Sequence, residues 1–245
     1  MINHKNELSH IREMYLSNGS FNIQYRGDET HVRRFISVLP ILHSFEKPDM
    51  YAYHDDIILS LEHFEVDGSK FKKKRGSQQR SSESAVLREF DSLEDSTSFH
   101  GQLPATYSLS NYKSNLNRIF QHHYSQIDSY KFNLLNFLQL PTSTQFYTGF
   151  FIEDVTTLTA LFDHPSLPGP IPIPLLHCDF FLDLFEQNPS LDFVVFASLY
   201  NCEQGFSFID RASLSEYRVH QLETSQAILL NSSPQYTGFI APLDS

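Results

Sequence analysis

The sequence predicts a single α/β domain with a mixed central sheet and flanking helices. Segments with strand character at 50–66, 146–152 and 193–197 alternate with segments that have the 3.6-residue periodicity of helices. The chain has 245 residues, the size of one large domain. Hydrophobic residues make up 40% and charged residues 19%, so a sizeable core is expected and wholesale disorder is excluded.

The N-terminal part predicts two helices separated by a short strand. Apolar residues recur at spacings of three and four over 1–17, which indicates a helix ended by Gly19. Alternating apolar and polar residues at 21–25 predict a strand. Asp28 can cap a second helix, expected over 29–45.

A β-hairpin is expected next, because residues 50–53 and 57–66 both have strand character. His54-Asp55-Asp56 lies between them and favours a tight turn. Ile57-Ile58-Leu59 is a continuous apolar run, which is typical of a strand that is buried on both faces.

Residues 67–114 interrupt this pattern and are expected to form a mobile insertion. The segment opens with a turn at Asp67-Gly68-Ser69 and contains a basic loop over 70–80. Its remainder is rich in Ser and acidic residues. Strands resume after it, so it is interpreted as an insertion within one domain rather than a linker between two.

The second half predicts further helices and strands. The clearest helix is expected over 115–139, where one apolar stripe runs at 3.6-residue periodicity up to Pro141. Residues 155–245 are interpreted as a C-terminal elaboration of the same domain. The other expected elements are a strand at 146–152, a proline-rich connector at 164–174, a helix at 179–185, and strands at 193–197, 206–209 and 227–230.

The charge balance and cysteine usage narrow the classes of protein. The net charge of −11 opposes indiscriminate coating of nucleic acid and binding to anionic membrane surfaces. The start of the chain is too polar for a signal peptide, and no apolar run approaches the ~18 residues of a membrane span. Cys178 and Cys202 have neither metal-binding nor redox spacing. A cytoplasmic protein without membrane contact is expected.

The basic loop is the exception in this acidic chain. Six positive charges fall within eleven residues without an acid: Lys70, Lys72, Lys73, Lys74, Arg75 and Arg80. Such a loop could contact the phosphate backbone of a nucleic acid. A solvated loop with no partner is the alternative interpretation.

The hairpin carries the candidate chemistry. Asp49 stands at the start of its first strand and Glu62 near the end of its second, so the turn brings the two carboxylates side by side. Paired carboxylates at one end of a sheet suit a hard divalent cation such as Mg²⁺ or Mn²⁺. If Phe64 belongs to the core, Glu62 points inward beside it, where an unpaired carboxylate is costly. The alternative is that Pro48-Asp49 only starts a turn.

These residues resemble the PD-(D/E)XK nuclease superfamily. In that family a Pro-Asp precedes one strand of a hairpin and an acid-x-Lys triplet closes the next; the matching residues are Pro48-Asp49 and Glu62-His63-Phe64. The order of elements over about 21–153 is also similar. The resemblance implies a restriction-endonuclease-like core and a Mg²⁺-dependent endonuclease that hydrolyses nucleic-acid phosphodiester bonds. By analogy, its setting would be prokaryotic or phage genome conflict.

One departure bears directly on catalysis, because Phe64 stands where the family has its catalytic lysine. The candidate replacements are Lys70, Lys72, Lys73 and Lys74 in the basic loop, or Lys131 on the later helix. A further acid that the family often carries before the hairpin would be Glu29 or Glu46.

The alternative is a catalytically inactive protein of the same fold that binds a protein or nucleic acid, joins a larger assembly, or forms a homo-oligomer. His122 and His123 project about 100° apart on a helix, so both cannot face one ion easily. His123 lies on the apolar stripe and is interpreted as a hydrogen-bonded core histidine. Glu153-Asp154 ends a strand, where it could join a site or cap the next segment.

Overall fold

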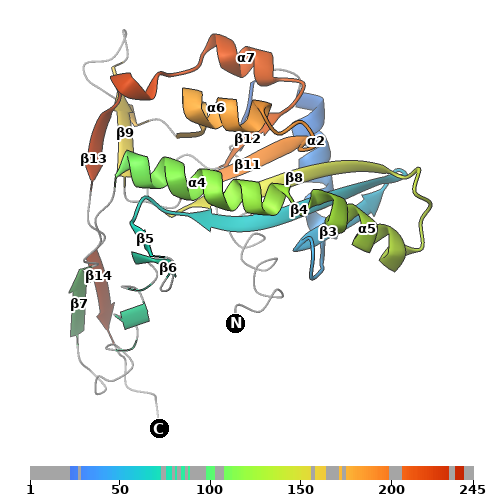
Figure 1. Cartoon of the computed structure of the whole chain (residues 1–245), viewed down its shortest axis with the longest axis horizontal. Coiled ribbons are helices and arrows are strands. Elements are labelled where there is room, and N and C mark those ends of the chain that lie inside the picture. Colours follow the sequence, from blue (N-terminus) through green and yellow to red (C-terminus); the bar gives the residue numbers. More distant parts are fainter. Residues whose placement is uncertain are drawn as a thin grey trace.

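A computed structural model describes residues 23–26, 29–72, 76–78, 81, 84–85, 88, 98–102, 108–155, 158–163, 171–172, 175–198, 206–231 and 235–239. A central mixed sheet has helices on both faces (Figure 1), which confirms the predicted α/β class. The helix expected at 1–17 lies outside the described residues. Within them, no helix is both long and apolar enough to cross a membrane.

The central sheet has seven strands. In spatial order they are β1 (Ile23–Gln24), β12 (Phe206–Asp210), β11 (Phe193–Ser198), β8 (Gln145–Asp154), β4 (Ile57–Val66), β3 (Met50–His54) and β2 (His43–Ser44). β11, β8 and β4 are parallel to one another, and so are β1 and β12. The pairs β4–β3, β3–β2 and β11–β12 are antiparallel.

The predicted hairpin is formed by β3 and β4. Asp55 and Asp56 make its two-residue loop, with φ angles of 51° and 61°. Positive φ at both central positions is the requirement of a type I′ turn, whose twist matches that of the flanking strands. The turn lies at the predicted position because Asp tolerates the left-handed region better than most residues do.

Helices cover the two faces of the sheet with separate cores. α2 (Glu29–Val38) covers one face, where Phe35 packs against Phe193 of β11 and Phe208 of β12. The other face carries α4 (Leu109–Tyr124), α5 (Ile127–Leu138), α6 (Asp179–Glu186) and α7 (Leu214–Val219). Along β4, even-numbered Phe64 and Val66 enter the core beneath α4, whereas odd-numbered Leu59 and Leu61 enter the core beneath α2.

The prediction of a single helix over 115–139 is wrong, because the structure has two helices there, α4 and α5. Ser125 interrupts the helix, and its hydroxyl donates a hydrogen bond to the carbonyl of His122 at 2.7 Å. Serine side chains compete in this way for helical carbonyls. Phe120 of α4 and Tyr130 of α5 still enter the same core, so the apolar stripe continues across the break.

Smaller elements complete the chain, several of them unexpected. α7, β9 and the short strands of 67–114 were not predicted, and α4 begins at Leu109, inside the expected insertion. The additional sheets are β10–β9–β13 (Ile171–Pro172, Leu158–Phe162, Ile228–Asn231), β14–β7 (Gln235–Phe239, Ser98–Gln102) and β5–β6 (Phe71–Lys72, Gly76–Ser77). The 3-10 helices are η1 (Leu39–Ile41), η2 (Leu175–His177) and η3 (Thr224–Gln226).

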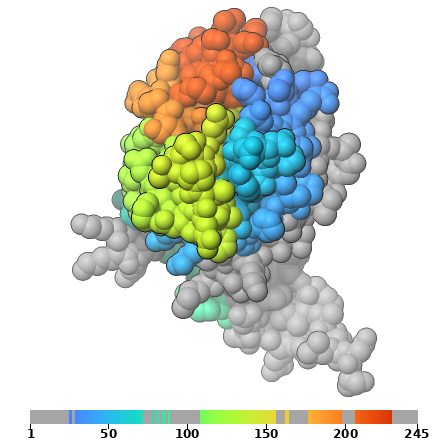
Figure 2. Space-filling model, turned by 90° about the vertical axis from the view of Figure 1, so that its right-hand side faces the viewer, coloured from blue at the N-terminus to red at the C-terminus, as the bar shows by residue number. Residues whose placement is uncertain are grey.

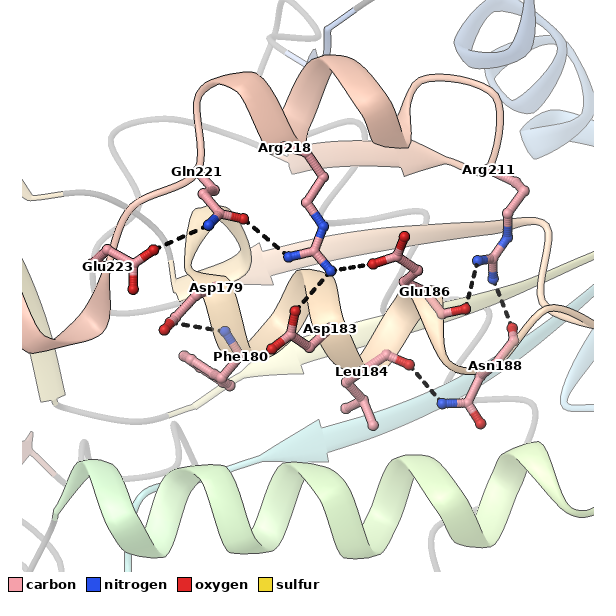
Figure 3. Close-up of polar contacts among 10 residues, drawn as sticks. All are labelled: Asp179, Phe180, Asp183, Leu184, Glu186, Asn188, Arg211, Arg218, Gln221 and Glu223. Carbon is pink, nitrogen blue, oxygen red and sulfur yellow. Dashed lines mark hydrogen bonds and ion pairs between the residues drawn. The ribbon is translucent and has the colours of Figure 1, made fainter.

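Two arginines connect α6 to the segment that follows β12 (Figure 3). One Nη of Arg211 donates to the carbonyl oxygens of Phe185, Asn188 and Leu191 at 2.8, 2.7 and 2.9 Å. These carbonyls lie at and beyond the C-terminal turn of α6, where helical partners are lacking. Arg218 of α7 instead pairs with exposed carboxylates of α6, among them that of Asp183 at 2.7 Å.

Replacement of these arginines should affect stability very differently. We expect Arg211→Met to lower the free energy of unfolding by about 2–4 kcal/mol, because three carbonyls lose a charged hydrogen-bond donor at once. Arg218→Met should cost about 1 kcal/mol or less, because its partners are solvent-exposed. Urea unfolding of both variants measures the difference; equal losses would contradict the capping role of Arg211.

His177 of η2 is a half-buried histidine packed on α7. Its ring stacks on that of Tyr217, with centroids 5.8 Å apart. Burial, assisted by the positive charge of Arg26, lowers the pKa of His177 from 6.5 to about 4. The imidazole is therefore neutral in the folded protein at pH values where the unfolded chain protonates it.

This difference predicts a loss of stability in mild acid. As the pH falls from 6.5 towards 4, the unfolded state binds a proton that the folded state does not, so the free energy of unfolding should decrease by up to about 3 kcal/mol. His177→Gln should flatten this part of the pH profile, measured by urea unfolding between pH 4 and 7. The control is His220→Gln at an exposed histidine. A profile that His177→Gln leaves unchanged would contradict the assignment.

Candidate functional site

The hairpin places Asp49 and Glu62 opposite each other on one face of the sheet. Met50 pairs with Leu61 in the ladder, and both enter the core beneath α2. Because side chains alternate along a strand, their neighbours Asp49 and Glu62 project to the opposite face, beneath α4 and α5. The Asp49 N–H donates to Oε2 of Glu62 at 3.3 Å, and the His63 N–H donates to Oδ2 of Asp49 at 2.8 Å. Both carboxylates are 7% exposed as whole residues.

Glu62 has protein partners from the helical layer as well. Nδ1 of His123, on α4, lies 2.7 Å from Oε1 of Glu62. The hydroxyl of Tyr130, on α5, also hydrogen bonds to Glu62. Burial, together with the negative charge of Glu62, raises the pKa of Tyr130, so its hydroxyl stays protonated and can donate. The carboxylate therefore faces three potential donors, which offset the cost of burying it.

Phe64 lies in the core beside this group and supports the imidazole. Its ring is stacked on that of His123, with centroids 4.8 Å apart and planes inclined by only 4°. The apolar stripe predicted that His123 is a hydrogen-bonded core histidine, and the structure identifies Glu62 as its partner. Tyr130 was not singled out as a site residue. The sequence signal is its place on the same apolar stripe as His123, which continues across the break between α4 and α5.

A second histidine–carboxylate pair lies on the opposite face. Nε2 of His63 is 3.0 Å from Oε2 of Glu153, and both side chains are less than a tenth exposed. The side chain of His63 projects from the same face of β4 as those of Leu59 and Leu61, so this pair lies on the α2 side of the sheet. Glu65 is half-buried and is the register partner of Glu153. The sheet thus separates Glu153 from Glu62.

Of the candidate lysines, the structure describes the side chains of Lys70 and Lys131. Nζ of Lys131 lies 5.8 Å from the ring centroid of Phe146, and Phe146 is four residues along β8 from the register partner of Glu62, about 13 Å of strand. Lys70 is exposed, and for Lys72 only the backbone in β5 is described. The rest of the basic loop lies outside the described residues: Lys73, Lys74, Arg75 and Arg80.

The additional acids considered for the site also lie elsewhere. Glu29 belongs to α2 on the other face, where it pairs with Arg33 at 2.5 Å and accepts a hydrogen bond from Tyr25. Glu46 is exposed in the turn between β2 and β3. Asp154 is buried at the end of β8, beneath the α4 side of the sheet.

The donor set limits the kind of metal that this site could hold. Among the described residues, no group of three or more His, Cys, Asp or Glu side chains is arranged to hold a metal ion. A closed site of the zinc type is therefore not formed by them. Magnesium differs, because it is commonly held by one or two carboxylates while waters and substrate oxygens complete its shell. Asp49 and Glu62 fit that requirement.

The partners of Glu62 predict its contribution to stability. In the absence of metal, Glu62→Gln should lower the free energy of unfolding by about 1–3 kcal/mol, because the amide presents a donor where the carboxylate accepted hydrogen bonds. Glu216→Gln, at an exposed position of α7, is the control and should change stability by less than about 0.5 kcal/mol. A metal-free melt of Glu62→Gln at or above the wild-type temperature would show that the carboxylate is unfavourable in the metal-free fold.

Comparison with known proteins identifies no relative of this chain. No protein-family model, curated protein or solved structure matches the chain. The functional argument therefore depends on the chain's own geometry: a buried pair of carboxylates, one directly before β3 and one on β4, with a histidine and a tyrosine from two helices directed at the second.

Proposed function

We propose that the protein is a metal-dependent nuclease that hydrolyses phosphodiester bonds, with Asp49 and Glu62 holding Mg²⁺. The observation that carries the proposal is the position of Asp49, directly before β3, opposite Glu62 on the antiparallel strand β4, with the two residues joined by the hydrogen bond from Asp49 N–H to Glu62. When bound there, Mg²⁺ would stabilise the negative charge that develops on the phosphoryl group.

The arrangement of elements around the hairpin supports the same proposal. α2 precedes an antiparallel succession of β2, β3 and β4, and α4 and α5 then lead to β8, which is parallel to β4. This is the order that the resemblance to PD-(D/E)XK nucleases implies for a restriction-endonuclease-like core. Asp49 lies directly before the second of these strands and Glu62 lies on the third, as in the matched motif.

His123 is the residue best placed to take over the role of the missing lysine. Its ring lies directly against Phe64, the residue that replaces that lysine. Glu62 engages Nδ1, which leaves Nε2 as the ring nitrogen that can exchange a proton with water or substrate. We therefore assign His123 to proton transfer in the proposed reaction, in place of Lys72 or Lys131.

A second candidate function has its own supporting observation. All three donors around Glu62 belong to the protein, and the described residues contain no three-residue metal cluster. A carboxylate satisfied in this way needs no metal. These facts favour a protein that keeps the nuclease-like arrangement without activity and binds nucleic acid or another protein, with the basic loop as the candidate contact for phosphate.

A cleavage assay tests the proposed activity. Purified protein is incubated with supercoiled plasmid, single-stranded DNA or RNA in Mg²⁺, Mn²⁺ or EDTA. We expect cleavage of at least one substrate with metal and none in EDTA. Asp49→Asn should abolish it, because a carboxylate ligand is lost. His123→Ala should slow it by about 100-fold or more, the usual contribution of a positioned acid or base.

The matched control is His122→Ala, since His122 is the exposed neighbour of His123 and should leave the rate unchanged. Thermal melts with and without Mg²⁺ accompany the assay, and metal should raise the melting temperature of the wild type but not of Asp49→Asn. Wild-type protein that cleaves nothing and melts identically with and without metal would overturn the nuclease proposal. Retained oligonucleotide binding in that case would favour the inactive alternative.

A further inference from the structure

A cavity of about 340 Å³ opens on the other face of the sheet, between α2 and the hairpin. The surfaces of these two elements adjoin in Figure 2, where α2 is blue and the hairpin is cyan. The volume lies within the range of small-molecule sites in proteins. Side chains of α2 line one wall, and β3, β4 and β8 contribute the other. Glu62 and Asp49 project from the opposite face, so the cavity is separate from the candidate nuclease site.

The α2 wall is polar because of residue spacing. Thr30, Arg33, Arg34 and Ser37 all line the cavity and are three or four residues apart, which places them on one stripe of the helix. The guanidinium of Arg33 is already paired with Glu29 at 2.5 Å. The wall therefore presents hydroxyl groups and one neutralised cation beside the side chain of Arg34.

Arg34 is the cation that remains available to a ligand. Its guanidinium lies 5.8 Å from the ring centroid of Tyr147, at the edge of the cavity. Within the part of the chain that the structure describes, no carboxylate pairs with it. This is unusual in a chain with a net charge of −11. An arginine fork at a cavity wall is suited to bidentate hydrogen bonding with a carboxylate or phosphate.

The opposite wall has an apolar, firmly supported part, while the exposed side chains of His54 and Asp55, 3.3 Å apart, also line it. Ala52 and Leu59 line it and are buried in the core beneath α2. Tyr147 stacks on Phe193 with centroids 4.6 Å apart, and a Cβ at neighbouring Gly149 would meet the Phe193 ring at 2.1 Å. The ring of Phe193 thus fills the space that a side chain at position 149 would need. Because Tyr147 stacks on this ring, its position is fixed as well. The aromatic and aliphatic surface is therefore formed before any ligand binds.

We propose that this cavity binds a small organic anion: a phosphate ester or carboxylate attached to a flat apolar body. The anionic group would meet Arg34, and the apolar body would lie on Ala52, Leu59 and the ring of Tyr147. The site needs both parts, because Arg34 is the lining arginine without a carboxylate partner among the described residues, whereas Ala52, Leu59 and Tyr147 of the opposite wall offer apolar contact. The proposal is independent of nuclease activity.

Calorimetric titration with three probes tests this site. Phenyl phosphate carries both parts, inorganic phosphate carries only the anion, and phenol carries only the ring. We expect phenyl phosphate to bind at least about tenfold more tightly than either of the others. Arg34→Gln should weaken phenyl phosphate binding about tenfold or more, as expected for a lost charge-assisted hydrogen bond. Arg118→Gln, on α4 across the sheet, is the matched control and should bind as the wild type does.

Methyl NMR signals of Ala52 and Leu59 locate the bound molecule, and they should shift on titration with phenyl phosphate in the wild type. Arg34 is exposed, so its replacement should leave the thermal melt unchanged, and the melt verifies this. The proposal is overturned if phenyl phosphate fails to bind saturably, if the two methyl signals do not move, or if Arg34→Gln and Arg118→Gln bind equally well.

Discussion

The parallel pairing of β4 with β8 is the constraint on which the rest of the structure depends. Every residue from Ile57 to Val66 has a register partner between Gln145 and Asp154, so the two longest strands form the centre of the sheet. Both strands are covered on both faces, by α2 on one side and by α4 and its neighbours on the other. A shift of one residue would exchange the two cores and would place Glu62 beneath α2.

That register also distributes the buried charge. Glu62 and Glu153 are both buried, and each meets a histidine, on opposite faces of the same strand pair. A buried carboxylate without a partner would cost several kcal/mol, so each face has to supply donors from whatever packs over it. Beneath α4 and α5 the side-chain donors to Glu62 come from the helices, whereas His63, the partner of Glu153, comes from the sheet itself.

The two proposed sites use opposite faces of one hairpin. Asp49 and Glu62 project towards α4 and α5, and Ala52 and Leu59 project towards α2. The type I′ turn at Asp55-Asp56 holds the two strands in register for both faces at once. Side-chain alternation alone therefore allows one short segment to contribute to an acidic group and to an apolar cavity wall.

Local patterns in the sequence determine much of this protein: the hairpin and its turn, the alternation that brings Asp49 opposite Glu62, and the strands β8 and β11. These features depend on neighbours a few residues away and on a two-residue period. The tertiary structure alone decided that His123 meets Glu62, that Glu29 lies across the sheet, and that Lys131 lies over Phe146. Periodicity tells which face a side chain occupies, but its partner depends on how helices and strands pack in three dimensions. That packing is set by contacts between residues far apart in the chain.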